Sequence, residues 1–410
     1  MKIRPDLVPA AERDNLEVVQ LTDESIPSSH IYMEAQIFTP DSRRMVLHRS
    51  AHPHGSDPKD PEHRYLVCDL EDHCRLAPLT MELGTTAPSI SPDGDWLYYF
   101  VDETDPANPG PFTLKRVRLD GSDREVIYVL DHPVTGTDFR LSRPYPLSTI
   151  SSDGRRIAIS GFLGDGRTDG APWGLLVFEV DEPSVRLVFH GPSWCNVHPQ
   201  YTRQTDADAS HDIMIQENHG NVASPDGRIE KLTGGRGADI HLIRDDGTSL
   251  RDFPWGRDGN EFCQGHQCWQ GRFDIAITST STRKPDERQL ISGRAAAHAG
   301  HFGAGTPGGW RSDLSRSFGG PDFYHFATDI AGSRLITDAG PRDGGGAVWL
   351  FDLPGAEDGA LSNARRVASP GSSWRKDTHI HPFLAPDGSS GFFNSDESGT
   401  LQAYMVRGWS

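Results

Sequence analysis

The amino-acid sequence predicts an all-β fold built from repeats, and composition, turn motifs and strand patterns agree on this. Hydrophobic residues make up 35% of the 410 positions and charged residues 24%, so the chain can bury a substantial core and is not disordered by composition. The 43 glycines and 30 prolines favour many tight turns. Short apolar runs that alternate with polar residues follow such turns, and we find no convincing helix longer than a few turns.

The most informative pattern is a turn followed by a short alternating apolar run, which returns along the whole chain. Clear copies are SPDGDWLYYF around Asp93 and SSDGRRIAIS around Asp153, and the copies at Gly271 and Gly332 are weaker. In a Pro-Asp-Gly turn, proline fixes φ, aspartate caps the turn and glycine accepts a positive φ. The turns recur about every 59 residues and are centred on Asp41, Asp93, Asp153, Asp206, Gly271, Gly332 and Asp387.

Each repeat has room for four strands, and repeats of this length with hairpin turns are typical of propeller blades. We therefore predict that residues 1–410 form a single seven-bladed β-propeller domain, with the N-terminal segment helping to close the ring. Residues 51–64 and residues 294–320 are longer than hairpins need, so both are expected to be long surface loops.

The charge balance and the cysteine content restrict the partners and the compartment. The formal net charge of −18 disfavours nucleic acid and anionic membrane surfaces as partners. No stretch approaches the roughly 20 apolar residues of a membrane span, and the N-terminus lacks the apolar core of a secretory signal. Five cysteines are too sparse for a disulfide scaffold. We expect a soluble, cytoplasmic protein with reduced thiols; the sequence predicts no oligomeric state.

The position of a residue within the repeat locates the candidate chemistry. The strand before each turn should be the innermost strand of its blade and should begin at one mouth of the central tunnel. Residues five to eight positions before the turns should therefore form a ring around that mouth, and four consecutive blades place histidine there. The ring positions include Glu34, Thr86, Tyr145, His198, His266, His325, and the pair His379 and His381.

Three of these histidines predict a metal site. His379 and His381 lie two residues apart on one strand, so both imidazoles point to the same side. His325 comes from the neighbouring blade. Three neutral imidazoles with open coordination positions suit a catalytic divalent metal such as manganese, zinc, iron or nickel.

The other residues at the mouth leave alternatives open. His266 could be a further ligand, a general base that titrates near neutrality, or a hydrogen-bonded histidine in the tunnel wall. His198 could bind substrate or simply pack at the start of a strand. Cys263 and Cys268 flank His266 at a spacing unlike that of zinc pairs, so we interpret them as buried thiols.

Short motifs in one order along most of the chain carry a resemblance to a known family. They include SHIYMEAQIFTPD (29–41), YPLSTISSDG (145–154), VHPQY (197–201), GHQCW (265–269) and THIHPFLAPDG (378–388). In this order and spacing, the chain resembles the oligogalacturonate lyase family of polysaccharide lyases. The resemblance implies a seven-bladed propeller that cleaves uronate-containing oligosaccharides by β-elimination to 4,5-unsaturated products. It also implies a divalent metal cofactor, with manganese as the first candidate.

The resemblance also implies roles for individual residues. It makes His266 the catalytic base and His325, His379 and His381 the metal ligands, which are the positions found in the ring. Binding of further sugar carboxylates falls to His198, Tyr145 and arginines near the mouth, such as Arg143 and Arg236.

Two positions depart from the family pattern. The family's glutamine ligand corresponds to Lys376, so the metal is expected to have three protein ligands or to use Asp377. The family's catalytic arginine corresponds to Asp239, and Arg236, three residues earlier, is the candidate to replace it. These departures favour a different uronate or linkage, or a loss of activity.

Two other functions are open on the same scaffold. A non-catalytic propeller of the TolB or WD-repeat type would bind a protein partner in its tunnel, but it leaves the four-blade run of histidines unexplained. A metal-dependent hydrolase usually needs carboxylate ligands, and the ring offers only Glu34. The lyase hypothesis in turn requires positive charge concentrated at one mouth of an acidic protein.

Overall fold

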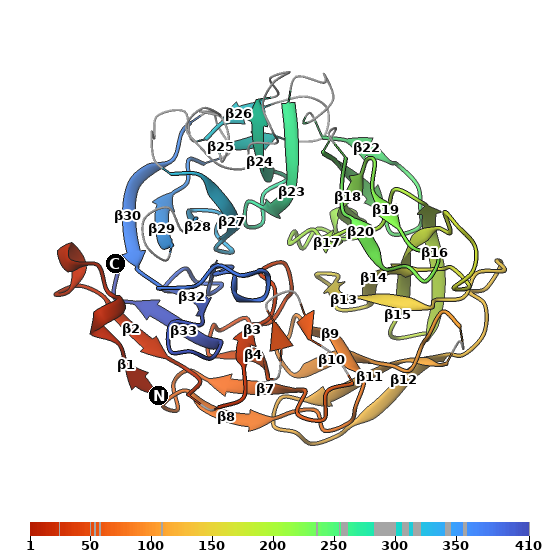
Figure 1. Ribbon diagram of the computed structural model, residues 1–410, viewed down its shortest axis with the longest axis horizontal. Helices are drawn as coiled ribbons and strands as arrows, with labels where there is room; N and C mark the ends of the chain where they lie inside the picture. The colour runs from red at the N-terminus through yellow and green to blue at the C-terminus, as the bar shows by residue number, and fades with distance from the viewer. Residues whose placement is uncertain are drawn as a thin grey trace.

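The computed structural model describes residues 1–23, 25–49, 51–52, 55–56, 59–107, 110–234, 237–253, 255, 261–282, 301–305, 311–314, 321–340, 346–355 and 359–409. In these ranges, seven antiparallel sheets stand around a central axis (Figure 1), which confirms the predicted all-β, seven-bladed propeller. The helices in the described ranges are short 3-10 turns such as η1 (Pro5–Leu7) and η2 (Ala10–Glu12). Among them, none is long and apolar enough to cross a membrane.

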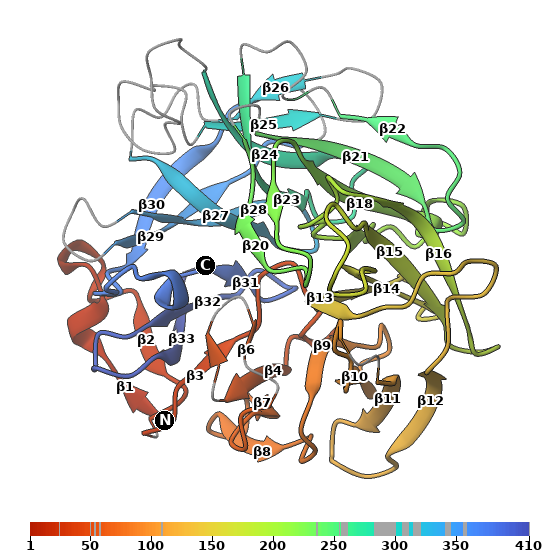
Figure 2. The same ribbon diagram turned by 45° about the vertical axis from the view of Figure 1, so that its right-hand side comes forward.

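Six blades are four-stranded and one is five-stranded, each running from an innermost to an outermost strand. Figure 2 shows the blades as twisted sheets packed side by side around the axis. The strands, blade by blade, are β3 (Ser28–His30), β4 (Arg44–Arg49), β7 (Arg64–Asp69), β8 (Arg75–Pro78); β9 (Thr85–Ile90), β10 (Trp96–Asp102), β11 (Phe112–Arg118), β12 (Glu125–Leu130); β13 (Arg143–Ile150), β14 (Arg156–Phe162), β15 (Trp173–Glu179), β16 (Ser184–Gly191); β17 (Gln200–Tyr201), β18 (Asp212–Asn218), β21 (Ala238–Arg244), β22 (Arg251–Asp252); β23 (Glu261–Trp269), β24 (Ala276–Thr282), β25 (His301–Gly305), β26 (Arg311–Asp313); β27 (Phe323–Thr328), β28 (Arg334–Ala339), β29 (Ala347–Asp352), β30 (Ser362–Ala368); and β31 (Phe383–Leu384), β32 (Ser390–Ser395), β33 (Gln402–Arg407), β2 (Glu17–Gln20), β1 (Lys2–Ile3).

Each of the seven predicted turns connects the innermost strand of a blade to the second strand. The turn between β9 and β10 shows why the motif folds this way. The Ser91 hydroxyl donates to Asp93 Oδ1 at 2.5 Å and accepts from the Trp96 amide at 3.0 Å, so the turn satisfies its own polar groups. The Asp206 turn is longer and contains η3 (Ala209–His211).

The ring is closed by strands from the two ends of the described chain. β2 pairs with β33 in antiparallel register, so that Val18 lies opposite Val406, and β1 adds beyond β2. Figure 1 accordingly shows both termini on one side of the ring. The Arg4 guanidinium bonds to both Glu397 carboxylate oxygens and joins the N-terminal segment to the β32–β33 loop. The predicted closure by the N-terminal segment is confirmed.

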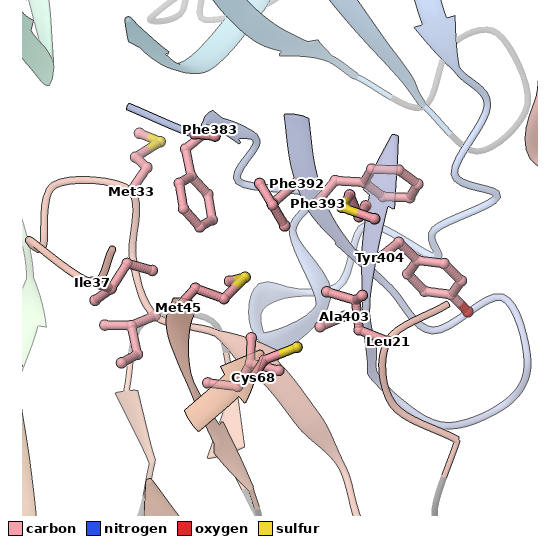
Figure 3. Close-up of a cluster of buried hydrophobic side chains, with 14 of the residues drawn as sticks. Leu21, Met33, Ile37, Met45, Cys68, Phe383, Phe392, Phe393, Ala403 and Tyr404 are labelled. Atoms are coloured by element: carbon pink, nitrogen blue, oxygen red, sulfur yellow. The ribbon is translucent and has the colours of Figure 1, made fainter. Parts of the chain in front are cut away.

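The seam between the first and the last blade holds the largest hydrophobic cluster (Figure 3). Met45 of the first blade and Phe392 and Tyr404 of the last are completely buried, and Phe383 packs beside Phe392 with ring centroids 5.5 Å apart. Burial of each such side chain stabilises the fold by about 1.5–3 kcal/mol. Apolar packing therefore supports the hydrogen-bonded closure.

Of the long loop expected over residues 294–320, residues 301–305 and 311–314 are described, and the rest lies outside the described residues. β25 and β26 lie within this segment, where β25 pairs with β24 as the third strand of its blade. Glycine and small residues suggested a loop, but the free edge of β24 requires a partner for its backbone groups. Residues 51–64 include a two-stranded hairpin of β5 (Ala51–His52) and β6 (Gly55–Ser56). A further hairpin, β19 (Val222–Ala223) with β20 (Ile229–Lys231), lies between β18 and β21.

The Glu82 carboxylate, in the loop between β8 and β9, predicts an acid-sensitive stability. Burial raises its pKa, but hydrogen bonds from the Tyr99 hydroxyl at 2.7 Å and the Lys115 ammonium at 3.0 Å outweigh this and lower the pKa from 4.5 to about 2. The stabilisation is thus complete above pH 4.5 and is lost as the pH falls through 2. We expect Glu82→Gln to lower the free energy of unfolding at neutral pH by about 2–3 kcal/mol.

Urea unfolding followed between neutral pH and pH 2 checks this. The wild type should lose stability relative to Glu82→Gln across the acid range. Glu103→Gln, an exposed carboxylate of the same blade, is the matched control and should follow the wild type. Parallel curves for the wild type and Glu82→Gln would contradict the assignment.

Candidate functional site

Irregular pairing of the innermost strands presents the ring residues to the tunnel. The β13–β14 register jumps between Pro144 and Ser148, and so leaves Tyr145 out of the ladder. The β23–β24 register jumps between Cys263 and Gln267, so His266 is not paired in the ladder. The β27–β28 register jumps between Phe323 and Phe326, so His325 is also left out of its ladder. Such bulges re-aim side chains and are common beside active sites.

Left-handed backbone occurs at the same level of the tunnel. His198, just before β17, has φ 46°, and His381, just before β31, has φ 45°. This region is unfavourable for residues other than glycine by about 1–3 kcal/mol, and such residues concentrate at functional sites. Gly265, with φ 81°, precedes His266 in the β23 bulge, and a Cβ there would collide with the Gln216 amide.

His325, His379 and His381 form one cluster at the tunnel mouth. One nitrogen from each ring lies within 4.8 Å of the others, and carboxylates are not members of this group in the described part of the chain. The His325 and His381 ring centroids are 4.1 Å apart, and that of His379 is 5.4 Å from each. The three residues predicted as ligands are therefore brought together from two neighbouring blades.

Asp338, on the second strand of the same blade as His325, holds two members of this cluster. Its carboxylate accepts from His325 Nδ1 at 2.8 Å and from the His325 amide at 2.9 Å, and it also accepts from the His381 amide at 3.2 Å. A proton on Nδ1 leaves the Nε2 lone pair of His325 for a metal. Burial raises the pKa of Asp338 to about 7. Sequence reasoning missed this residue, although an aspartate within the apolar run LITDA was a signal.

The imidazoles of the site are held neutral. Burial lowers the pKa of His325 and of His266 well below the usual value, and the neighbouring histidines add to this shift. Burial also lowers the pKa of His379. Neutral imidazole is the form that binds a metal or accepts a proton.

His266 lies beside the three-histidine cluster without belonging to it. Its ring centroid is 4.6 Å from that of His325. Its Nδ1 is buried and makes no hydrogen bond to the described residues. This position suits a proton acceptor next to the cluster better than a further ligand.

His198, Tyr145 and Glu34 form a second group on the other side of the mouth. His198 Nδ1 donates to Glu34 Oε2 at 2.6 Å, and the Tyr145 hydroxyl lies 3.2 Å from His198 Nε2. Tyr32, which sequence reasoning did not single out, joins the two groups, with ring centroids 5.4 Å from His198 and 4.9 Å from His381. Both nitrogens of His198 are thus engaged within the protein.

An aromatic wall, also missed from the sequence, lies beside the metal cluster. The Trp374 ring stacks on His379 with centroids 5.1 Å apart, and Tyr324 meets Trp374 at 5.5 Å. Trp374 lies in the connection that leads to the histidine pair, where the turn repeat gives no register. Lys376, the position of the family's glutamine, opens the 3-10 turn η6 (Lys376–Thr378) that precedes His379.

Of the two predicted arginines, Arg143 is engaged by the β19–β20 hairpin. Arg143 Nε donates to the Asp226 carbonyl at 3.1 Å, and its Nη2 lies 3.7 Å from the Asp226 carboxylate in the β19–β20 hairpin. Arg236 lies outside the described residues. Asp239, at the position of the family's arginine, is 2.9 Å from His219 Nε2. Cys263 and Cys268 are buried and form no disulfide with a described residue, as predicted.

Comparison with solved structures includes two oligogalacturonate lyases that match nearly the whole chain. An oligogalacturonate lyase in complex with manganese has a TM-score of 0.65 and 16% identity, covering 96% of this chain and 93% of that one. An oligogalacturonate lyase from Vibrio parahaemolyticus has a TM-score of 0.69 and 16% identity, covering 99% and 96%. The chain has the fold of the oligogalacturonate lyases. TolB from Acinetobacter baumannii matches with a TM-score of 0.42 and 10% identity over 84% and 77%. No family model and no curated protein sequence matches.

The contacts of Asp338 predict its effect on metal binding. Asp338→Asn removes one acceptor oxygen and the charge that orient His325 and His381, so we expect metal affinity to fall about 10–100-fold. Competition with a chelating dye measures this. Asp352→Asn, an aspartate on β29 of the same blade that accepts from Asn363, is the control and should bind like the wild type. Equal affinity in the wild type and Asp338→Asn would contradict the proposed positioning.

Proposed function

We propose that the protein is a metal-dependent lyase that cleaves uronate-containing oligosaccharides by β-elimination. The observation that carries this proposal is the cluster of His325, His379 and His381 with a fourth imidazole, that of His266, 4.6 Å from His325 and outside the cluster. A divalent cation beside a neutral base is the pair that this reaction needs. The fold shared with two oligogalacturonate lyases supports the substrate class.

The three histidines fit a divalent metal. Their donor nitrogens converge, burial favours the neutral forms of His325 and His379 by lowering their pKa values, and Asp338 orients His325 and His381. We propose manganese first, because one similar solved structure is a manganese complex. A set of imidazoles also suits zinc, iron or nickel. When bound, the cation neutralises the uronate carboxylate and stabilises the negative charge that develops beside carbon 5.

His266 then acts as the base in this proposal. The proton on carbon 5 of a uronate is weakly acidic, because the adjacent carboxylate resists further negative charge. Neutral His266 takes that proton, a contribution of about 10²–10⁴-fold. The electron pair forms the C4=C5 double bond, and the glycosidic oxygen leaves carbon 4. The half-buried position of His266 limits competition from water.

Further sugar units bind along the same mouth. We assign this role to His198 and Tyr145, which Glu34 and their mutual hydrogen bond hold in place, and to Arg143. The Arg143 side chain is exposed, so its weak contact with Asp226 can be exchanged for a sugar carboxylate. Arg236 is proposed to replace the family's catalytic arginine. The five cysteines are all described and form no disulfide with one another, which favours the reducing cytoplasm as the site of action.

Elimination by the wild type can be followed directly, because a C4=C5 double bond conjugated with the carboxylate absorbs in the ultraviolet. With manganese, we expect absorbance to rise on at least one member of a panel of uronate oligosaccharides. His266→Ala should reduce the rate about 10²–10⁴-fold while metal content stays unchanged. His190→Ala, an exposed histidine on β16, is the control. Chain cleavage without new absorbance would indicate a hydrolase, and no cleavage of any uronate would contradict the proposal.

Metal content provides a separate prediction. His379→Ala removes one of three ligands, so elemental analysis after dialysis should find little bound metal, whereas the wild type and His190→Ala should keep close to one ion per chain. Chelation should abolish elimination, and added manganese should restore it. A wild type without bound metal would instead favour a binding propeller.

A further inference from the structure

A cavity of about 230 Å³ occupies the tunnel beyond the histidine mouth. All seven blades line it, at the ends of their innermost strands. Ala327 follows His325 by two residues on β27, and Phe383 follows His381 by two residues, so the cavity lies further along the same strands. It adjoins the site proposed for the metal and the sugar at Glu34, while none of the four histidines of that site lines it.

The wall of this cavity combines apolar surface with positive charge. Phe38, Ile90, Ile150 and Phe383 contribute apolar side chains, and Arg203 and Arg272 contribute guanidinium groups. Among the described lining residues, the one acid is Glu34, whose carboxylate is engaged by His198. The wall therefore offers cations and apolar contacts without a competing anion.

Arg203 lacks the anionic partner that a withdrawn guanidinium normally has. Its single hydrogen bond to the described residues runs from Nη1 to the Thr328 carbonyl at 3.3 Å, and none of the described carboxylates pairs with it. Burial lowers the pKa of Arg203. The nearby Asp329 carboxylate instead accepts hydrogen bonds from the Ser333 hydroxyl at 2.6 Å and from the Arg334 amide at 3.0 Å.

Arg156, a buried arginine of the third blade, shows the usual arrangement. Its Nη2 lies 2.7 Å from Asp153 Oδ2, and its Nη1 lies 3.3 Å from Asp245 Oδ2. A guanidinium has five N–H donors, and Arg203 is only half-buried, so the donors that the protein does not engage are open to water or to a ligand in the cavity. Arg203 has no such ion pair with a described carboxylate, so its guanidinium is available to an anion in the cavity.

We propose that this cavity binds a small organic carboxylate with an apolar body. Arg203 holds the carboxylate through charge-assisted hydrogen bonds, and the exposed Arg272 adds attraction at the cavity opening. The body packs against Phe38 and Phe383. The volume lies just below the range of about 300–1,000 Å³ of small-molecule sites, so the ligand is of the size of 3-phenylpropionate. A polyhydroxylated sugar would gain little from these walls.

Calorimetric titration of the whole protein with 3-phenylpropionate tests the proposal. We expect saturable binding by the wild type, and at least about 10-fold weaker binding of the uncharged 3-phenylpropionamide. Arg203→Met should weaken binding of the acid about as much. Arg155→Met removes an exposed arginine that pairs with Asp181 on the outside of the molecule, and it should bind the acid like the wild type.

Each possible result of this titration supports or overturns the proposed carboxylate site. Absence of binding by the wild type, or equal binding of acid and amide, overturns the proposal. So does displacement of 3-phenylpropionate by galacturonate, which would make the cavity part of a sugar site. If Arg203→Met fails to fold, as judged by thermal unfolding, Arg203→Lys and the acid–amide comparison on the wild type decide. Binding here is independent of metal content and of elimination, so the two proposals stand or fall separately.

Discussion

Closure of the ring is the constraint on which the rest of the structure depends. The pairing of β2 with β33 converts a row of sheets into a circle, and the cluster of Met45, Phe392 and Tyr404 fills the seam beside it. The candidate site lies across this seam. Tyr32 of the first blade contacts His381 of the last, and Glu34 reaches over to His198. Residues separated by most of the sequence meet only because the circle is complete.

Sequence reasoning could predict whatever depends on the repeat. Turns such as those at Asp93 and Asp153 fold through their own hydrogen bonds, and together with weaker copies they marked the register of the blades. This register placed His266, His325 and His381 at one mouth. The separation of His266 from the three-histidine cluster was not predictable, because it depends on the size of the β23 bulge.

Residues outside this register escaped prediction. Asp338 acts from a second strand, and Trp374 lies in an irregular connection, so neither follows from counting back from a turn. The contact of Arg143 with Asp226, in the hairpin of the next blade, likewise does not follow from the turn repeat. Similarly, the glycine content of β25 did not predict a strand. This segment becomes a strand because it pairs with the edge of β24. Contacts between strands and between blades determine the positions of all these residues, and such contacts cannot be counted from a turn.

The interlocked ends have a consequence for the order in which the protein matures. β2 precedes, and β33 follows, all the other blades along the chain. During synthesis, the first blades can fold early, but the ring of blades around the mouth is incomplete until β33 has been made and pairs with β2. His379 and His381 are translated shortly before that strand. The histidine cluster is therefore complete only in molecules whose last blade has been made, so a chain that stops before this blade lacks two of its three histidines.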